Sequence, residues 1–138
     1  MATIEQIFQD YGTEVSNNVE KRQFESLEYY RYVKDKGGLN RGRLFLLDSS
    51  GNSVQREIPA FPHINRVYHL ENGVDQFFGD SPFHVEEKLD GYNTRIFQHG
   101  GEIYTTTKGG FICPFTTEWA RLWGEIANLY KFYADHPE

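Results

Sequence analysis

The second half of the chain carries three short runs of alternating apolar and polar residues, and these runs restrict the possible folds more than any other feature. They cover residues 83–88, 93–98 and 102–107, with an Asp-Gly pair at 90–91 and a Gly-Gly pair at 100–101. Alternation with a period of two is typical of half-buried strands, and such glycine pairs favour tight hairpin turns. We therefore expect an antiparallel three-stranded meander in this half.

The first half predicts shorter elements. Apolar side chains recur at helical spacing over residues 4–11, and Thr3 with Gln6 matches the pattern of a capping box. Residues 43–58 predict a β-hairpin, because two strand-forming runs flank a polar turn that contains glycine. Residues 19–36 are ambiguous, since their apolar spacing permits a helix while their cluster of tyrosines favours a strand.

A helix is expected after Pro114. Apolar and aromatic side chains recur at three- and four-residue steps from Trp119 to Tyr133, and Thr116 or Thr117 is a suitable first cap. We interpret this stripe as a face that packs on the core. If the strands that it would cover are missing, the stripe becomes an exposed patch that promotes self-association.

Together these elements predict an α+β fold of antiparallel strands with flanking helices. We divide the chain into an N-terminal helix and hairpin module, residues 1–60, and a second unit, residues 61–138. A chain of 138 residues corresponds to about one domain of ordinary size.

The charge balance argues against a free-standing nucleic-acid binder. The formal net charge is -6 at pH 7, whereas phosphate binding usually requires a basic surface. Four basic residues lie close together in the sequence and are more typical of a solvated loop than of a binding patch. They are Lys34, Lys36, Arg41 and Arg43.

The single cysteine, Cys113, excludes a disulfide within the chain, and we interpret it as a buried thiol. The five histidines show no metal-ligand spacing. The N-terminus shows no signal-peptide pattern, and no apolar run is long enough to cross a membrane. We expect a cytoplasmic protein with no membrane partner.

Lys88 ends the first predicted strand of the second half, directly before the turn at 90–91. A lysine amine is a poor nucleophile while protonated near its free pKa of about 10.4, so covalent chemistry requires desolvation or nearby cations. A metal-bound triphosphate would supply both. Gly91 lets a ligand approach the backbone, and Asn93 offers an acceptor and two donors. The simpler interpretation is a solvated lysine beside an ordinary hairpin turn.

Three blocks of sequence, in this order, resemble the archaeal-type ATP-dependent RNA ligases, the RNA ligase 3 group of the covalent nucleotidyltransferase superfamily. The blocks are FPHINR at 61–66, EEKLDGYNTRI at 86–96 and TKGGFICPFTTE at 107–118. The resemblance covers at least residues 61–120. It implies that residues 61–138 are part of an adenylyltransferase domain of ATP-grasp-like type, from the N-terminal part of such a ligase.

The resemblance implies a covalent mechanism. Lys88 would attack the α-phosphate of ATP to form a lysine-AMP phosphoramidate, AMP would pass to an RNA 5′-phosphate, and a 3′-hydroxyl would displace it. The implied cofactors are ATP with Mg²⁺ or Mn²⁺. No direct metal ligand is implied, although Asn93 lies near the ribose and the water shell of the metal. The implied nucleotide-binding residues are Glu86, Glu87, Leu89, Asp90, Gly91, Asn93 and Lys108.

Two features depart from the family pattern. The second motif usually carries an arginine where this chain has Lys108, and lysine lacks the planar fork that makes bidentate contacts. The further motifs of the superfamily, one with glutamate and two with lysine, are not found after Thr117. We therefore expect the 138-residue chain to be weakly active or inactive by itself.

Two other functions stay open. The chain could be a non-catalytic remnant that binds a nucleotide or a partner, with Lys88 vestigial. It could also act on DNA or on capped messenger ends, because the Lys-x-Asp-Gly core is shared with DNA ligases and capping guanylyltransferases. The expected partners are RNA 5′-phosphate and 3′-hydroxyl ends, and a homodimer is a further option.

Overall fold

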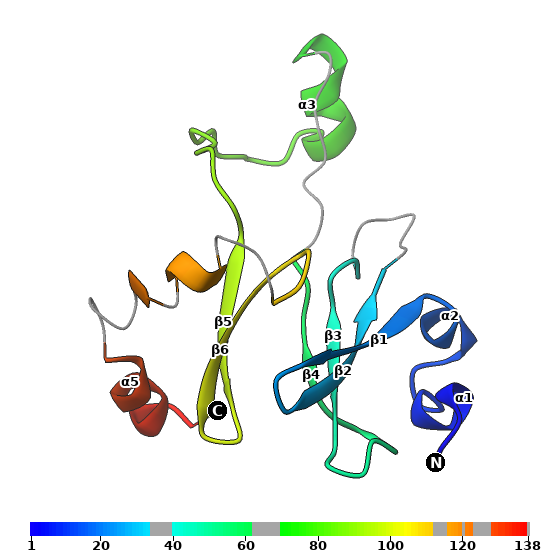
Figure 1. The fold of residues 1–138 in the computed structure, drawn as a ribbon. Helices are drawn as coiled ribbons and strands as arrows, with labels where there is room; N and C mark the ends of the chain where they lie inside the picture. Colours follow the sequence, from blue (N-terminus) through cyan, green and yellow to red (C-terminus); the bar gives the residue numbers. More distant parts are fainter. Residues whose placement is uncertain (34–39, 62–69, 112–115, 120, 123–127, 138) are drawn as a thin grey trace.

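The computed structural model describes residues 1–33, 40–61, 70–111, 116–119, 121–122 and 128–137. These residues form an α+β fold with two antiparallel sheets and short flanking helices (Figure 1). The fold class expected from the sequence is therefore confirmed.

The larger sheet has four antiparallel strands in the order β1-β2-β3-β4. The ambiguous stretch of the sequence forms its first hairpin, because β2 pairs with β3 as well as with β1 and the tyrosines pack on both faces. The hairpin predicted over residues 43–58 is confirmed as β3 and β4, with a bulge between Leu46 and Leu47. The strands are β1 (Val19–Phe24), β2 (Leu27–Tyr32), β3 (Leu44–Leu47) and β4 (Val54–Ile58).

Two N-terminal helices cover one face of this sheet (Figure 1). Helix α1 (Ile4–Ile7) begins with the predicted capping box between Thr3 and Gln6, and α2 (Thr13–Ser16) follows Gly12. Phe8, directly after α1, packs edge-on against Phe45 of β3 with ring centroids 5.0 Å apart. The first helix predicted from the sequence is thus confirmed, although it ends earlier than residue 11.

The second sheet covers the opposite face of the four-stranded sheet (Figure 1). It consists of β5 (Thr94–His99) and β6 (Glu102–Thr107), which pair from Thr94↔Thr107 to His99↔Glu102. Phe97, Tyr104 and Phe111 pack there against Leu44 and Leu46. All of β3 is consequently buried, since its alternate side chains point into two different hydrophobic clusters.

The strand predicted over residues 83–88 is wrong. Residues 81–93 form no strand, and every side chain in this segment is exposed. An alternating run becomes a strand only where a partner strand and a surface for its apolar face are present. Among the described residues no strand pairs with this segment; Phe83 is covered in part, by stacking on Phe78 of the helix at 70–78, and Val85 is 87% exposed. Only the second hairpin of the expected meander therefore forms.

The single helix predicted after Pro114 is also wrong in part. Residues 116–119 and 121–122 are helical, but Asn128 caps a separate helix, α5 (Leu129–Asp135), by accepting a hydrogen bond from Lys131 N. Tyr130 of the stripe is 57% exposed, whereas Tyr133 is half-buried and its hydroxyl donates to Ile96 O at 2.9 Å, so the described part of the stripe is a core face only in part. The exposed aromatic side chains form the kind of patch for which we expect self-association.

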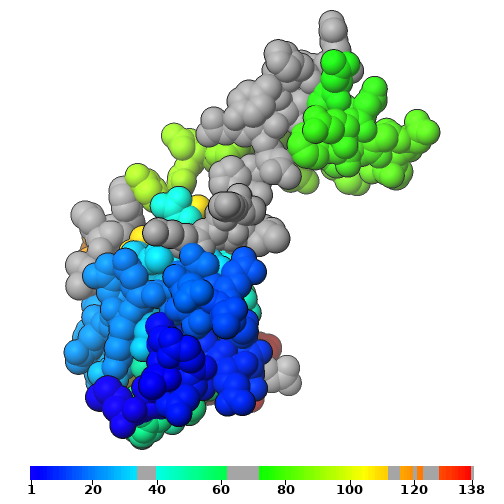
Figure 2. Space-filling view, turned by 90° about the vertical axis from the view of Figure 1, so that its right-hand side faces the viewer, coloured from blue at the N-terminus to red at the C-terminus, as the bar shows by residue number. Residues whose placement is uncertain are grey.

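Helix α3 (Leu70–Phe78) was not predicted and stands away from both sheets (Figures 1 and 2). The division of the chain at residue 60 stays a prediction. Residues from both sides of it, such as Ile58 and Phe97, share one hydrophobic cluster.

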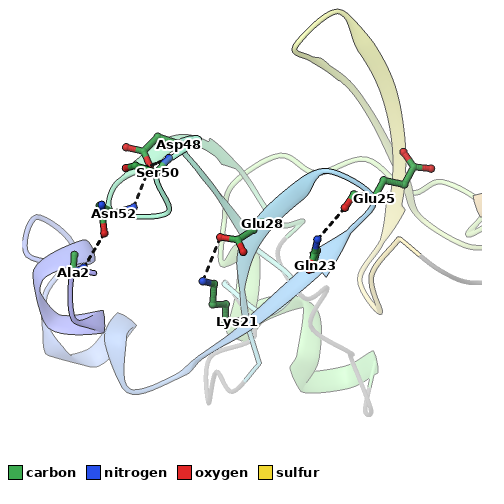
Figure 3. A network of polar contacts seen from close by, with 8 residues as sticks. All are labelled: Ala2, Lys21, Gln23, Glu25, Glu28, Asp48, Ser50 and Asn52. Carbon is green, nitrogen blue, oxygen red and sulfur yellow. Dashed lines mark hydrogen bonds and ion pairs between the residues drawn. The ribbon is translucent and has the colours of Figure 1, made fainter.

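The turn between β3 and β4 is organised around one carboxylate (Figure 3). Asp48 accepts hydrogen bonds from the hydroxyls of Ser53, at 2.6 Å, and Ser50, at 2.8 Å, and from the backbone N–H of Asn52, at 3.1 Å. The Asn52 side chain in turn accepts from the N–H of Ala2 at 2.8 Å. The bonds from Ser53 and Ser50 hold the pKa of Asp48 well below its usual range.

This low pKa predicts a pH dependence of stability. Because the folded protein favours the ionised form, the contribution of Asp48 is fully present above the ordinary aspartate pKa near 4 and is lost as the pH falls toward the lower folded value. We expect Asp48→Asn to lower the free energy of unfolding at pH 6 and to differ less from wild type at pH 3, measured by urea unfolding. If the difference in the free energy of unfolding between Asp48→Asn and wild type did not change with pH, this prediction would be contradicted.

Candidate functional site

The lysine motif lies on the exposed segment that leads into β5. Lys88 and its neighbours Glu86, Glu87, Leu89 and Asp90 are all exposed. Within the described part of the chain, Lys88 makes no hydrogen bond or ion pair, and a Cβ added at Gly91 would meet nothing within 4 Å. A ligand can therefore reach this backbone and this amine without displacing protein atoms.

The β5–β6 hairpin brings the ends of the two motifs together. Thr94 pairs with Thr107, so Asn93 and Lys108 lie directly beyond the same end of the hairpin. Lys88 is six residues before Thr94, and six extended residues span at most about 20 Å. The expectation that both lysines lie at strand ends is confirmed for Lys108 and wrong for Lys88.

Lys108 and Gly109 form a two-residue turn between Thr107 and Gly110. Thr107 N–H donates to Gly110 O at 3.0 Å, and Gly110 N–H donates to Thr107 O at 3.1 Å. The turn packs closely on the loop before β3, because a Cβ at Gly42 would lie 3.2 Å from Lys108 Cα. Gly42 also has a φ of +89°, so glycine suits this position on both counts.

Arg31 of β2 contacts this turn and was missed by the sequence interpretation. By strand alternation it lies on the face of Tyr29, toward β5 and β6, and its Nη1 donates to Gly109 O. Its Nη2 lies 3.7 Å from Glu20, and its Nε is buried without a hydrogen-bond partner. The only signal in the sequence was the spacing: Arg31 follows Leu27 and Tyr29 at steps of two, so in a strand all three side chains lie on one face.

A pocket of about 240 Å³ lies beside the turn. Three of its lining residues are cations, Arg31, Arg41 and Lys108, and the others are Tyr32, Val33 and Gly109. The structure therefore gathers cations from three separate segments of the chain. The sequence interpretation gave no role to Arg31 and placed Arg41 in a solvated loop.

The basic residues between positions 34 and 43 differ in the contacts that they make. Arg43 is bound to Glu57, with Nη2 and Nε 2.5 and 2.6 Å from Oε1, and lies over the ring of Phe45. Arg41 instead lines the pocket. Lys34 and Lys36 lie outside the described residues, as does Cys113. The expectation of a solvated loop is thus wrong for Arg43, whereas Arg41 is exposed as expected.

Arg95 joins the hairpin to the larger sheet. Its side chain is buried, and its guanidinium donates to Pro59 O at 2.9 Å and to Thr107 O at 3.1 Å. Burial lowers the pKa of Arg95 to about 10. The residue therefore remains a cation at neutral pH, and it fixes the end of β4 and the residue before Lys108 relative to β5.

Replacing Arg95 by alanine is expected to lower the free energy of unfolding by about 2–3 kcal/mol. Two hydrogen bonds from a charged donor would be lost, and Pro59 O would lose this donor while Thr107 O keeps the N–H of Gly110. The loss is partly offset by removing a buried charge. Urea unfolding measures the change. Arg121→Ala is the matched control, because Arg121 pairs with Glu118 on the surface and should change stability by less than about 1 kcal/mol. Equal effects of both substitutions would contradict the role given to Arg95.

Among the described residues, no group of three or more His, Cys, Asp or Glu side chains is placed to hold a metal ion. None of the helices in that part of the chain has the length and apolar character needed to span a membrane.

Comparison with known proteins adds three findings. Residues 81–137 match the family model described as RNA ligase. An uncharacterized protein of Methanocaldococcus jannaschii, MJ0414, is 31% identical over 96 residues, which is 70% of this chain and 23% of that protein. A solved structure described as "Putative ATP-dependent DNA ligase from Aquifex aeolicus" superposes with a TM-score of 0.58 at 36% identity, over 79% of this chain and 29% of that one.

The fold and the lysine motif are those of a ligase-type nucleotidyltransferase. The similarity is to such ligases, because residues 81–137 match the RNA ligase family model and the fold is similar to that of the Aquifex aeolicus structure. It spans between 23% and 29% of the length of the relatives it matches.

Proposed function

We propose that the chain carries the adenylate-accepting lysine of an ATP-dependent RNA ligase, and that this lysine is Lys88. One observation carries the proposal: the RNA ligase match covers residues 81–137 and so contains both Lys88 and Lys108. The β5–β6 hairpin supports it, since Lys108 lies beside the start of the strand that follows the lysine motif.

In the proposed reaction the neutral amine of Lys88 attacks the α-phosphorus of ATP. A nitrogen–phosphorus bond forms, the bond to the oxygen that bridges the α- and β-phosphates breaks, and pyrophosphate leaves. An RNA 5′-phosphate oxygen then takes the adenylyl group and releases the lysine amine. Finally a 3′-hydroxyl attacks the 5′-phosphorus, AMP leaves, and the strand gains one phosphodiester bond.

The other motif residues are proposed to bind the nucleotide. Glu86, Glu87, Leu89, Asp90 and Gly91 are exposed on the same segment as Lys88, and this exposure supports their contact with ATP. Asn93 and Lys108, beyond the paired ends of the hairpin, would lie near the ribose and the phosphates.

Mg²⁺ or Mn²⁺ would accompany ATP. Mg²⁺ is often held by substrate phosphates together with only one or two carboxylates. The described residues do not form a metal site by themselves, so no step of the proposed reaction is assigned to the metal.

A DNA substrate is the second candidate. It is favoured by one observation, namely that the printed description of the Aquifex aeolicus structure refers to DNA. We prefer RNA because the family model that matches residues 81–137 is that of RNA ligases. A cytoplasmic location and a homodimer are also proposed, on the single cysteine and on the exposed aromatic side chains of α5.

Incubation of the purified chain with α-labelled ATP and Mg²⁺ tests the proposal. We expect slow labelling of the protein through a bond that is labile in acid and stable in base, and no labelling from γ-labelled ATP, because the γ-phosphate leaves with pyrophosphate. Adding RNA or DNA with a 5′-phosphate to the labelled protein then identifies the strand that accepts AMP. Absence of label from α-labelled ATP would contradict activity of the 138-residue chain by itself.

A further inference from the structure

We propose that Arg31 and Arg41, in the pocket that Lys108 also lines, bind a phosphate group of a single-stranded nucleic acid next to the nucleotide that Lys108 would contact. The inference rests on the proposed function, because the strand would be the one that Lys88 chemistry seals. It goes further by assigning Arg31 and Arg41, which lie outside the matched segment 81–137, to substrate binding.

The charge of the pocket is opposite to that of the whole chain. The net charge is -6, yet three cations line one pocket of about 240 Å³. In the described part of the chain one carboxylate offsets them, since Glu20 lies 3.7 Å from Arg31 and also pairs with Arg22 at 2.6 Å. Among the described residues, Arg41 and Lys108 have no ion-pair partner. A local excess of positive charge on an acidic protein indicates an anionic ligand.

The pocket is held in place before any ligand binds. Arg31 is anchored on Gly109 O, and its buried Nε has no hydrogen-bond partner, so the guanidinium keeps an unused donor. The close contact between Gly42 and Lys108 fixes the loop next to Arg41 against the turn. Cations whose supports are already ordered lose less conformational freedom when they bind a phosphate.

The adjoining pocket favours a nucleotide chain over an isolated anion. A pocket of about 290 Å³ shares Arg31 and Gly109 with the first one and is also lined by Phe24, Tyr29 and Phe111. Phe24 is half-buried and stacks on Phe111 with ring centroids 4.9 Å apart. Tyr29 and Phe111 are buried in the core, so Phe24 is the ring of this pocket that a base can reach. Cations next to an accessible aromatic ring are the combination by which proteins hold single strands, the cations at phosphates and the ring at a base.

The position relative to Lys88 is also suitable. Lys108 follows the strand whose end pairs with Thr94, and Lys88 is six residues before Thr94. A strand bound in the two pockets would therefore have an end within reach of the proposed lysine adenylate. This placement distinguishes the pocket from a basic patch elsewhere on the surface.

Fluorescence anisotropy with a labelled single-stranded RNA, at low salt and without ATP, tests the inference. We expect Arg41→Gln to weaken binding about 5-fold to 10-fold and to reduce the slope of log affinity against log salt by about 1, the change for one lost phosphate contact. Lys131→Gln is the matched control, because Lys131 is an exposed cation on α5, paired with Asp135, and should change affinity less than 2-fold. Circular dichroism confirms that both variants are folded.

Three results would overturn the inference: no difference between Arg41→Gln and wild type, an equal loss in Lys131→Gln, or complete displacement of RNA by ATP, which would assign the pocket to the nucleotide. Comparing RNA with a 5′-phosphate and a 5′-hydroxyl separates a terminal phosphate from a backbone one, and either outcome supports a strand phosphate. ATP is added only in the separate competition measurement, so the direct binding result is independent of Lys88 labelling, and failure of one leaves the other intact.

Discussion

Lys88→Ala is expected to reduce labelling of the chain by α-labelled ATP to background. The proposed covalent bond has no other attachment point in the motif, and loss of a nucleophile removes the whole reaction path rather than part of it. Because Lys88 makes no hydrogen bond or ion pair within the described part of the chain, the substitution should leave the free energy of unfolding unchanged within about 0.5 kcal/mol. Labelling and urea unfolding of the same preparation measure both effects.

Two controls make this result specific. Lys88→Arg keeps a positive charge but places a guanidinium, which stays protonated, where a nucleophilic amine is needed, so it should also abolish labelling. Lys131→Ala removes another exposed lysine and should label as wild type does. Label that persists in Lys88→Ala would show that a different residue accepts the adenylate or that the label is adventitious.

Phe45→Ala is expected to lower the free energy of unfolding by about 4 kcal/mol, the largest stability effect of any prediction made for this chain. Phe45 is 0% exposed at the centre of β3, and its ring packs edge-on against Phe8 at 5.0 Å and Tyr11 at 5.1 Å. Alanine would leave a cavity between the sheet and the N-terminal helices. Urea or thermal unfolding measures the loss.

Phe132→Ala removes an equally large aromatic ring from α5, where it is 53% exposed, and should change stability by less than about 1 kcal/mol. A loss comparable to that of Phe45→Ala would mean that α5 contributes to the core. If the free energy of unfolding of Phe45→Ala were nearly that of wild type, the burial of β3 between two layers would be contradicted.

Local sequence patterns predicted those elements whose partners lie nearby in the chain. The capping box at Thr3 and Gln6, the hairpin of β3 and β4, and the hairpin of β5 and β6 each depend on residues within about fifteen positions. In these cases the turn residues and the alternating pattern carry enough information, because both halves of the interaction are encoded together.

The same patterns were insufficient where a distant surface decides the outcome. The alternating run at 83–88 has strand chemistry, yet no described segment pairs with it. The aromatic stripe after residue 116 has helical spacing, yet Asn128 interrupts it and its described part is a core face only in part. Periodicity reports how a segment can bury a face, but not whether another element covers that face.

The site shows the same distinction. The motif that contains Lys88 and the second motif at Lys108 are determined by the sequence alone, because contiguous residues define them. The hairpin turn predicted at 90–91 does not form, because no strand precedes it. Only the tertiary structure brings Arg31 and Arg41 to Lys108, since pairing of β2 with β3 and packing of the hairpin on that sheet join segments 77 and 67 positions from the lysine. A cluster of cations contributed by separate segments leaves no periodic trace in the sequence, because the contacts that assemble it are long-range.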